Sequence, residues 1–220
     1  MNKKLALAFS ASTAFLGLYF MFNVRKKRRN KTKRILCIEV GGTSFKAAIV
    51  IFDKEKHSQY QIHNLITGKT ETPKEVCAVI VKKYSNLKFD SVSVASFGPL
   101  NLNKGKDYGK ILSAPNERKV PWTNISFANL LKEQLGKEVL VETDVNASAL
   151  GEKHFGEHGD CSSLCYITIG TGVGIGLIVN GKTVHGYQHP EGGHSLVSLK
   201  DEDKELETSC LYHKNCVEVL

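Results

Sequence analysis

The sequence predicts an α/β fold, and three observations support this prediction. Short runs rich in β-branched residues alternate along the chain with segments whose apolar residues recur at helical spacing. Two of the predicted strands lead directly into glycine-rich turns, at 41–43 and 170–174. The chain has 220 residues, of which 41% are hydrophobic, so it is long enough to form one substantial core or two small lobes.

Local signals place the elements in the first part of the chain. Pro73 and Ser126 stand where two helices are expected to begin, and Gly136 is expected to end the second helix. The stretch 101–123 is rich in Asn, Lys, Gly and Pro, so we expect a long loop there. The first three strands follow one another and predict a β-meander. In order, the expected elements are strands at 35–40, 45–52 and 61–67, a helix at 73–84, a strand at 91–97, a helix at 126–135, a strand at 138–142 and a helix at 145–155.

A second segment follows the last of these helices. It contains expected strands at 164–169 and 176–179, and Asn180-Gly181 is a strong signal for a hairpin turn. Both segments contain a strand, a glycine-rich turn and another strand, so two lobes could hold one polyphosphate between them. The predicted regions are an N-terminal segment at 1–34, a first domain at 35–157 and part of a second domain at 158–220.

The formal net charge of +8 is unevenly distributed along the chain. Residues 1–34 contain ten Lys or Arg and no acidic residue, so the rest of the chain has 20 basic and 22 acidic side chains. The body of the protein is therefore not basic, and we expect no nucleic-acid partner.

Residues 5–22 form an 18-residue apolar run that is just long enough to cross a bilayer as a helix. Eight positive charges follow the run and two precede it, which predicts a membrane anchor with the body in the cytoplasm. A cleaved signal peptide would have a shorter apolar region followed by small residues. A cleaved or organelle-targeting presequence remains the alternative.

The six cysteines are expected to be reduced in a cytoplasmic body. Cys37 and Cys77 lie in apolar runs and are predicted to be core residues. A structural role is expected for Cys161 and Cys165 too.

The motif Cys210-x-x-His213-x-x-Cys216 places three metal ligands within one short loop. His194 could complete a tetrahedral zinc site, which would be structural because no coordination position would remain open. His185 and His189 compete for the fourth place. A chance cluster of Cys and His is the other alternative.

The glycine-rich turns are candidates for binding an anion. Gly41, Gly42 and Thr43 follow a buried strand, so their amide groups and the Thr hydroxyl can approach a phosphate closely. Taken alone, such a turn is usually only a hairpin. The run 170–174 repeats the arrangement and could mimic a dinucleotide-binding fingerprint. A strand is expected after it where that fingerprint needs a helix, which argues against this interpretation.

Asp144 lies where a predicted strand meets a predicted helix, at the mouth of an α/β sheet. A base in this position could accept the proton of a hydroxyl that attacks a phosphoryl group. The alternative is that Asp144 only caps the helix. Asn146 could likewise be only a polar residue of the first helical turn.

Six motifs occur in a fixed order along the body. They are Ile38-Glu-Val-Gly-Gly-Thr43, Ser96-Phe-Gly-Pro99, Thr143-Asp-Val-Asn-Ala147, Ile167-Thr-Ile-Gly-Thr-Gly172, His189-Pro-Glu-Gly-Gly-His194 and Cys210-Leu-Tyr-His-Lys-Asn-Cys216. Over 35–218 the chain resembles the ROK family of sugar kinases, and within it the bacterial-type fructokinases. The resemblance implies an actin/RNase H-like (ASKHA) fold, with ATP, Mg²⁺ and a Zn²⁺ near the sugar site.

The resemblance also implies roles for single residues. Asp144 would be the catalytic base. Phosphate binding would fall to Gly41, Gly42, Thr43, Gly170, Thr171 and Gly172. Sugar binding would fall to Gly98, Asn146, Glu191 and His194, and zinc binding to His194, Cys210, His213 and Cys216.

Two positions favour fructose as the hexose substrate. Glu39 stands where many glucokinases of the family have Asp, and Thr143 stands where they have Asn. The expected reaction is the phosphorylation of fructose to fructose 6-phosphate. Ser44 departs from the family because Lys often occupies its place, so a charge contact there is in doubt.

The family pattern continues well beyond the zinc loop, whereas this sequence ends at Leu220. The first domain is therefore expected to be complete and the second truncated, and we expect the 220-residue chain to show little kinase activity by itself. Two interpretations follow: an ATP-dependent fructokinase, or a truncated, non-catalytic sugar-binding or scaffold protein tethered to a membrane. The oligomeric state does not follow from the sequence, which is compatible with a homodimer.

Overall fold

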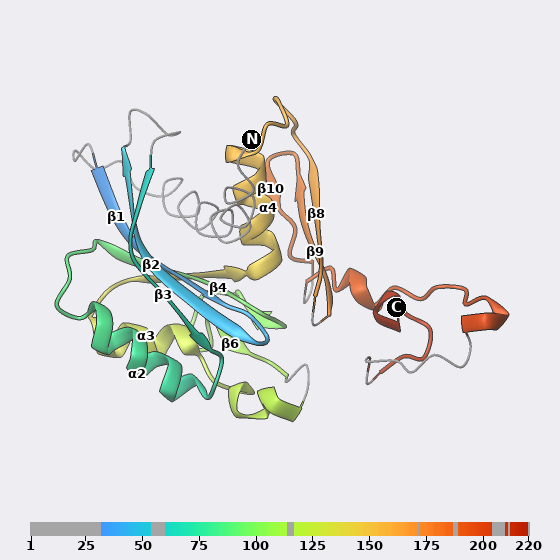
Figure 1. Cartoon of the computed structure of the whole chain (residues 1–220), viewed down its shortest axis with the longest axis horizontal. Coiled ribbons are helices and arrows are strands. Elements are labelled where there is room, and N and C mark those ends of the chain that lie inside the picture. Colours follow the sequence, from blue (N-terminus) through green and yellow to red (C-terminus); the bar gives the residue numbers. More distant parts are fainter. Residues whose placement is uncertain are drawn as a thin grey trace.

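The computed structural model describes residues 32–53, 60–113, 117–170, 172–186, 189–203, 210 and 212–219. Within them the first segment forms a five-stranded mixed sheet with the strand order β3-β2-β1-β4-β7 (Figure 1). The strands are β1 (Thr32–Val40), β2 (Ser44–Asp53), β3 (Tyr60–Lys69), β4 (Ser91–Ser96) and β7 (Val139–Thr143). The first three are antiparallel neighbours, so the predicted β-meander is confirmed.

The three strands β1, β4 and β7 run parallel, so their carboxyl ends meet at one edge of the sheet. Val40 pairs with Ser96 across β1 and β4, and Ser96 pairs with Thr143 across β4 and β7. The turn after β1, the loop after β4 and the helix after β7 therefore begin next to one another. Ligands of open α/β sheets bind at this edge, which makes it the place to look for a functional site.

Helices cover both faces of the sheet (Figure 1). They are α2 (Pro73–Tyr84) and α3 (Phe127–Leu135) on one face and α4 (Asp144–Phe155) on the other. Alternate residues of β1 reach the two cores. Leu36 and Ile38 belong to the core under α2 and α3, whereas Ile35 and Cys37 pack in the same core as Ala147 of α4. The predicted burial of Cys37 is confirmed.

The predicted helix boundaries follow from side-chain and glycine caps. Thr72 and Glu75 form a reciprocal capping box at the start of α2, directly before Pro73. Ser126 caps α3 by accepting a hydrogen bond from a backbone N–H of its first turn. Gly136 ends α3 in the left-handed conformation, with φ of 61°. The starts and stops expected from Pro73, Ser126 and Gly136 are therefore confirmed.

The second segment forms a three-stranded antiparallel sheet of order β10-β9-β8 (Figure 1). Its strands are β8 (Leu164–Ile169), β9 (Val173–Val179) and β10 (Lys182–Thr183). Asn180 and Gly181 have φ of 50° and 76°, as a tight hairpin turn requires. Helix α4 packs against this sheet as well, and a Cβ at Gly176 would collide with the backbone carbonyl of Val145. Only glycine allows this close contact between the two segments.

The loop expected at 101–123 has more structure than its composition predicts. β5 (Leu100–Asn101) pairs with β6 (Lys110–Ile111), and the 3-10 helix η1 (Glu117–Trp122) follows. Trp122 is fully buried and its indole N–H donates to the backbone oxygen of Glu71 at 2.7 Å. Pairing across an intervening turn and burial of an aromatic ring are tertiary effects that a loop-like composition does not reveal.

The longest described helices, α2 and α4, have 12 residues each, which is fewer than the roughly 20 that cross a bilayer. In the part of the chain that the structure describes, no helix is both long and apolar enough to span a membrane. The anchor predicted at 5–22 lies outside the described residues.

Candidate functional site

The turn at 41–43 lies at the carboxyl end of β1. The Gly41 N–H donates to the Ser44 oxygen at 3.0 Å and closes the turn, and the Thr43 oxygen accepts from the Thr70 N–H at 3.0 Å. A Cβ at Gly41 would lie only 3.2 Å from the Ser44 oxygen. The turn therefore offers a compact backbone surface at the same sheet edge as Asp144.

Asp144 is the first residue of α4, but it is not the N-cap of the helix. Thr143 has that role, because its hydroxyl accepts a hydrogen bond from the Asn146 N–H at 3.2 Å. The interpretation of Asp144 as a simple helix cap is therefore wrong. Its Oδ1 accepts instead from the Val145 N–H at 2.9 Å.

Desolvation raises the pKa of Asp144 to about 6 against the lowering effect of nearby backbone N–H groups, and the charge of Glu191 raises it further. Burial also raises the pKa of Glu39, which Lys46 lowers and Asp144 raises. Glu39 is the second-last residue of β1, close to the 41–43 turn, so two carboxyl groups influence each other at this edge. A carboxyl group with a pKa near neutrality is suited to exchange protons.

Asn146 is buried in α4, and protein groups occupy its side-chain amide. Its Oδ1 accepts from the Leu177 N–H at 3.1 Å. Its Nδ2 donates to Glu142 Oε1 at 3.3 Å and to the Val184 oxygen at 3.2 Å. These bonds join α4 to the second sheet, so the structure favours a structural role for Asn146 over the predicted sugar contact.

The second glycine-rich turn connects β8 and β9. The Gly170 N–H donates to the Gly172 oxygen at 2.9 Å, and Thr171 lies outside the described residues. β9 begins directly at Val173, so a strand follows the turn and a dinucleotide-binding fingerprint does not fit. Glu218 Oε1 accepts from the Val173 N–H at 3.0 Å. The Glu218 side chain thus binds the backbone at the end of this turn.

Gly98 of the first segment lies beside Glu191 of the second. A Cβ at Gly98 would be 3.7 Å from Glu191 Oε1 and 3.4 Å from His189 Cδ2. Burial raises the pKa of Glu191, an electrostatic effect of His194 lowers it, and the charge of Glu218 raises it further. The predicted sugar contacts Gly98, Glu191 and His194 are therefore brought into one neighbourhood.

The ligand atoms of His194, Cys210, His213 and Cys216 all lie within 4.8 Å of one another. Cys210 Sγ is 3.5 Å from His194 Nδ1 and 3.6 Å from His213 Nδ1. In a tetrahedral site with Zn–S of about 2.3 Å and Zn–N of about 2.0–2.1 Å, sulfur and nitrogen ligands are about 3.6 Å apart. The four residues therefore fit a zinc ion in both donor type and spacing.

Backbone groups favour the thiolate form of Cys210. Desolvation raises its pKa, but hydrogen bonds from the backbone N–H groups of Tyr212 and His213 and from the His213 and Cys216 side chains together lower it to about 6. These nitrogens lie 3.4 Å and 3.3 Å from Sγ. The thiolate is the form that binds a metal ion.

His185 and His189, the competitors for the fourth ligand position, do not join this cluster. His185 Nε2 donates to Glu142 Oε2 at 2.8 Å, and His189 Nε2 accepts from the Leu100 N–H at 2.9 Å. Both rings line a cavity of about 330 Å³ beside residues 100–103. The fold therefore selects His194 as the fourth candidate ligand.

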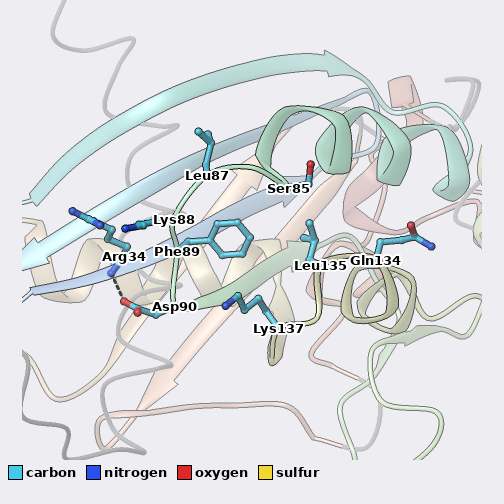
Figure 2. A pocket seen from close by; sticks show the side chains of 9 residues that line it. All are labelled: Arg34, Ser85, Leu87, Lys88, Phe89, Asp90, Gln134, Leu135 and Lys137. Carbon is cyan, nitrogen blue, oxygen red and sulfur yellow. Dashed lines mark hydrogen bonds between the residues drawn. The ribbon is translucent and has the colours of Figure 1, made fainter.

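A second hollow, of about 390 Å³, lies at the opposite edge of the sheet, where β1 and β4 begin (Figure 2). Arg34, Lys88 and Lys137 bring positive charge to it, and Asp90 accepts from the Arg34 N–H at 2.9 Å. The C-cap residue of α2, Ser85, and the last residues of α3 also line it, and cations at helix carboxyl ends are favourable without any ligand. We assign no binding role to this hollow.

Sequence reasoning did not single out two acidic residues that the structure places at the site. Glu218 Oε2 lies 3.8 Å from His194 Nδ1, and Glu142 is buried directly before Thr143. Glu218 follows Cys216 by two residues, and this proximity to a metal motif was the available signal. Nothing local distinguishes Glu142 from any other residue at the end of a strand.

Comparison with known proteins identifies similar sugar kinases. A fructokinase from Zymomonas mobilis subsp. mobilis is 34% identical over 199 residues, which are 87% of this chain and 63% of that protein. A fructokinase from Lactococcus lactis subsp. cremoris is 37% identical over 182 residues, 82% of this chain and 59% of that protein. The chain thus spans about three-fifths of the length of these curated relatives.

A solved structure shows the same architecture. The ROK family glucokinase from Streptomyces griseus in complex with glucose and AMPPNP superposes with a TM-score of 0.64 at 25% identity. The superposition covers 84% of this chain and 56% of the glucokinase. The expected actin/RNase H-like α/β fold is confirmed, with the described residues forming part of it.

The predicted membrane-anchored localisation needs correction. The relatives are named as sugar kinases, and no described helix can span a bilayer. The apolar run at 5–22 suggested an anchor only by its length and flanking charges, and it precedes the region that the relatives share. We therefore do not retain the membrane partner or the membrane localisation.

The match extends over nearly all of the described residues. The family profile covers 35–220, which begins within β1 and includes both sheets and the Cys/His cluster. The chain therefore belongs to the ROK family.

Proposed function

We propose that this chain carries the hexose-binding and proton-accepting part of an ATP-dependent sugar kinase, and that the hexose is fructose. The observation that carries the proposal is the meeting of Asp144, Gly98 and Glu191 at one end of the sheet. Similarity to proteins named as fructokinases supports fructose as the substrate and fructose 6-phosphate as the product.

Asp144 is proposed to act as the general base. Its pKa of about 6 means that it is mostly ionised at neutral pH yet still binds a proton readily. It would accept the proton of the fructose O6 hydroxyl as that oxygen attacks the γ-phosphoryl group. The absence of a side chain at Gly98 leaves space beside Glu191, whose carboxylate can accept hydrogen bonds from other sugar hydroxyls.

The glycine-rich turns at 41–43 and 170–172 are proposed to line the phosphates of ATP with backbone N–H groups. Mg²⁺ bound with ATP would neutralise charge on the β- and γ-phosphates. Glu39 fits an oxygen ligand for this ion, because its Oε2 is buried with no hydrogen-bond partner and its cationic neighbour, Lys46 Nζ, is 3.8 Å away.

Zinc is proposed to be structural and to hold the loop that carries His194. With all four ligands supplied by the protein, the metal would order a segment that has little apolar content of its own. We further propose the domain division at residue 158, with 35–157 as the first domain and 158–220 as part of the second. Under this division α4 belongs to the first domain and packs against the sheet of the second.

The proposal is tested by calorimetric titration of the chain with fructose and glucose, followed by a coupled kinase assay with ATP and Mg²⁺. Fructose should bind more tightly than glucose. Glu191→Gln should weaken fructose binding, whereas Glu157→Gln, at an exposed position, should not. Tighter binding of glucose would reassign the substrate, and binding of neither sugar would reject the assignment as a hexose kinase.

A further inference from the structure

We propose that His185 is a positioning residue for Asp144: it holds the Glu142 carboxylate, and that carboxylate fixes the first turn of α4. This inference rests on the proposed role of Asp144 as base. His185 and Glu142 are 43 positions apart in the sequence. They meet where the end of β7 faces the segment that follows β10.

Glu142 is a buried carboxylate that needs several hydrogen-bond donors. Its side chain is 5% exposed. His185 Nε2 lies 2.8 Å from Oε2 and 3.0 Å from Oε1, and the Thr143 N–H donates to Oε1 at 2.9 Å. A buried charge is tolerated only when it is paired and hydrogen-bonded in this way. Loss of His185 would remove the one cationic partner among these donors.

The same carboxylate reaches α4 through Asn146. Glu142 Oε1 accepts from Asn146 Nδ2 at 3.3 Å, and Asn146 in turn bonds Leu177 and Val184 of the second segment. Thr143, whose N–H binds Glu142, is the N-cap of α4. Every one of these bonds involves a residue within two positions of Asp144 in sequence. The hydrogen bonds therefore fix the backbone on both sides of the proposed base.

The network also ties the second sheet to the first turn of α4, which begins at Asp144. Asn146 holds β9 against the first turn of α4, where a Cβ at Gly174 would lie 2.7 Å from the Val145 side chain. This close packing contributes to the desolvation around Asp144. Weaker packing would admit water and lower the pKa of Asp144 from about 6 toward its ordinary value of 3.8.

The charge state of His185 is set by its immediate neighbours. The hydrogen bond to Glu142 raises the pKa of His185 above 6.5, burial opposes the shift, and the charge of Glu142 adds to it. The other titratable ring nearby is His189, with centroids 6.4 Å apart, and burial lowers its pKa. Glu142 therefore faces one imidazole that is readily protonated and one that stays neutral near pH 7.

Nuclear magnetic resonance can test the inference without kinase activity. The Val145 N–H binds the Asp144 carboxylate, so its chemical shift reports the ionisation of Asp144. In the wild-type chain the midpoint should be near pH 6. His185→Ala should lower it by about one unit or more through rehydration, and His185→Gln, which keeps a donor at the Nε2 position, should lower it less.

The chain offers a matched control in His158, which contacts Glu152 at 3.0 Å in a solvent-exposed pair. His158→Gln should leave the Val145 midpoint unchanged. A merely structural role for His185 would lower the melting temperature of its variants without moving that midpoint. Should His185→Ala fail to fold, the wild-type chain still provides a test, because the His185 ring and the Asn146 side-chain amide should titrate together above pH 6.5.

The inference is overturned if the Val145 midpoint is the same in wild type and both folded His185 variants, or if His185 titrates at or below pH 6.5. Fructose titration of the same samples separates the two proposals. A wild-type chain that does not bind fructose but shows the expected midpoint shift rejects the sugar-kinase assignment and retains the positioning role. Fructose binding with no midpoint shift rejects only the positioning role.

Discussion

The backbone N–H of Val145 donates to the carboxylate of Asp144 at 2.9 Å, within the first turn of α4. This bond favours the ionised carboxylate, whereas desolvation, the larger effect, disfavours it. The balance leaves Asp144 with a pKa of about 6. Two consequences can be measured, one for catalysis and one for stability.

For catalysis, the rate of fructose phosphorylation by a full-length version of this kinase should depend on ionised Asp144. The rate should rise about tenfold per pH unit below pH 6 and level off above it, because only the carboxylate accepts a proton. Asp144→Asn should reduce turnover by about 10²–10⁴ while sugar binding persists. The pH dependence of turnover and a fructose titration of the variant check this, and unchanged turnover in Asp144→Asn would reject the role.

For stability, the raised pKa of Asp144 has the opposite effect on folding from the lowered pKa of an ordinary paired carboxylate. Folded Asp144 binds its proton more tightly than the unfolded chain does, so the folded state loses stability as pH rises from about 4 to about 6. The loss is at most about 3 kcal/mol for a shift of roughly two units. Asp144→Asn should therefore raise the melting temperature at pH 7.5 and change it little near pH 4.

Asp160→Asn provides the control for this stability prediction, since Asp160 is exposed. It should leave the melting temperature unchanged at both pH values. Equal melting temperatures for wild type and Asp144→Asn at pH 7.5 would show that the ionised Asp144 carboxylate does not destabilise the folded state.

A third prediction concerns the Cys/His cluster. The purified chain should contain about one zinc ion, and Cys210→Ser together with Cys216→Ser should abolish it, because two thiolate ligands are lost. Elemental analysis gives the metal content. The matched control is Cys161→Ser together with Cys165→Ser, two cysteines that lie outside the cluster. Stoichiometric zinc in the first double variant would reject the assignment.

The sequence predicted the elements with strong local signals. Pro73, Ser126 and Gly136 mark helix ends through backbone geometry and capping, and both effects act within a few residues. The same is true of the turn at Asn180-Gly181. The spacing within Cys210-x-x-His213-x-x-Cys216 is also local, so three of the four candidate metal ligands could be recognised together.

The sequence could not predict contacts that form only when distant segments meet. His194 was the predicted fourth metal ligand, with His185 and His189 as competitors, and only the fold excludes His185 by directing it to Glu142. Likewise, Asn146 looked like a sugar contact because of its motif. In the structure its side-chain amide forms hydrogen bonds with backbone groups more than 30 residues away, in β9 and after β10.

The outward face of β8 carries two apolar side chains that the described residues leave in contact with solvent. Ile167 is 57% exposed and Ile169 is 83% exposed. They pair across strands with Ile175 and Val173 of β9, so the apolar surface extends over both strands. Because β8 is also the edge strand of its described sheet, its backbone groups add to the tendency to associate.

We therefore expect the 220-residue chain to self-associate through this face. Ile167→Thr together with Ile169→Thr should shift it toward the monomer, because Thr keeps the β-branched shape that suits a strand and removes apolar surface. Sedimentation velocity over a range of concentrations measures the change. Ile62→Thr, on the edge strand β3 of the other sheet and 38% exposed, is the control and should not alter association. Equal self-association of the double variant and wild type would place the contact elsewhere on the molecule.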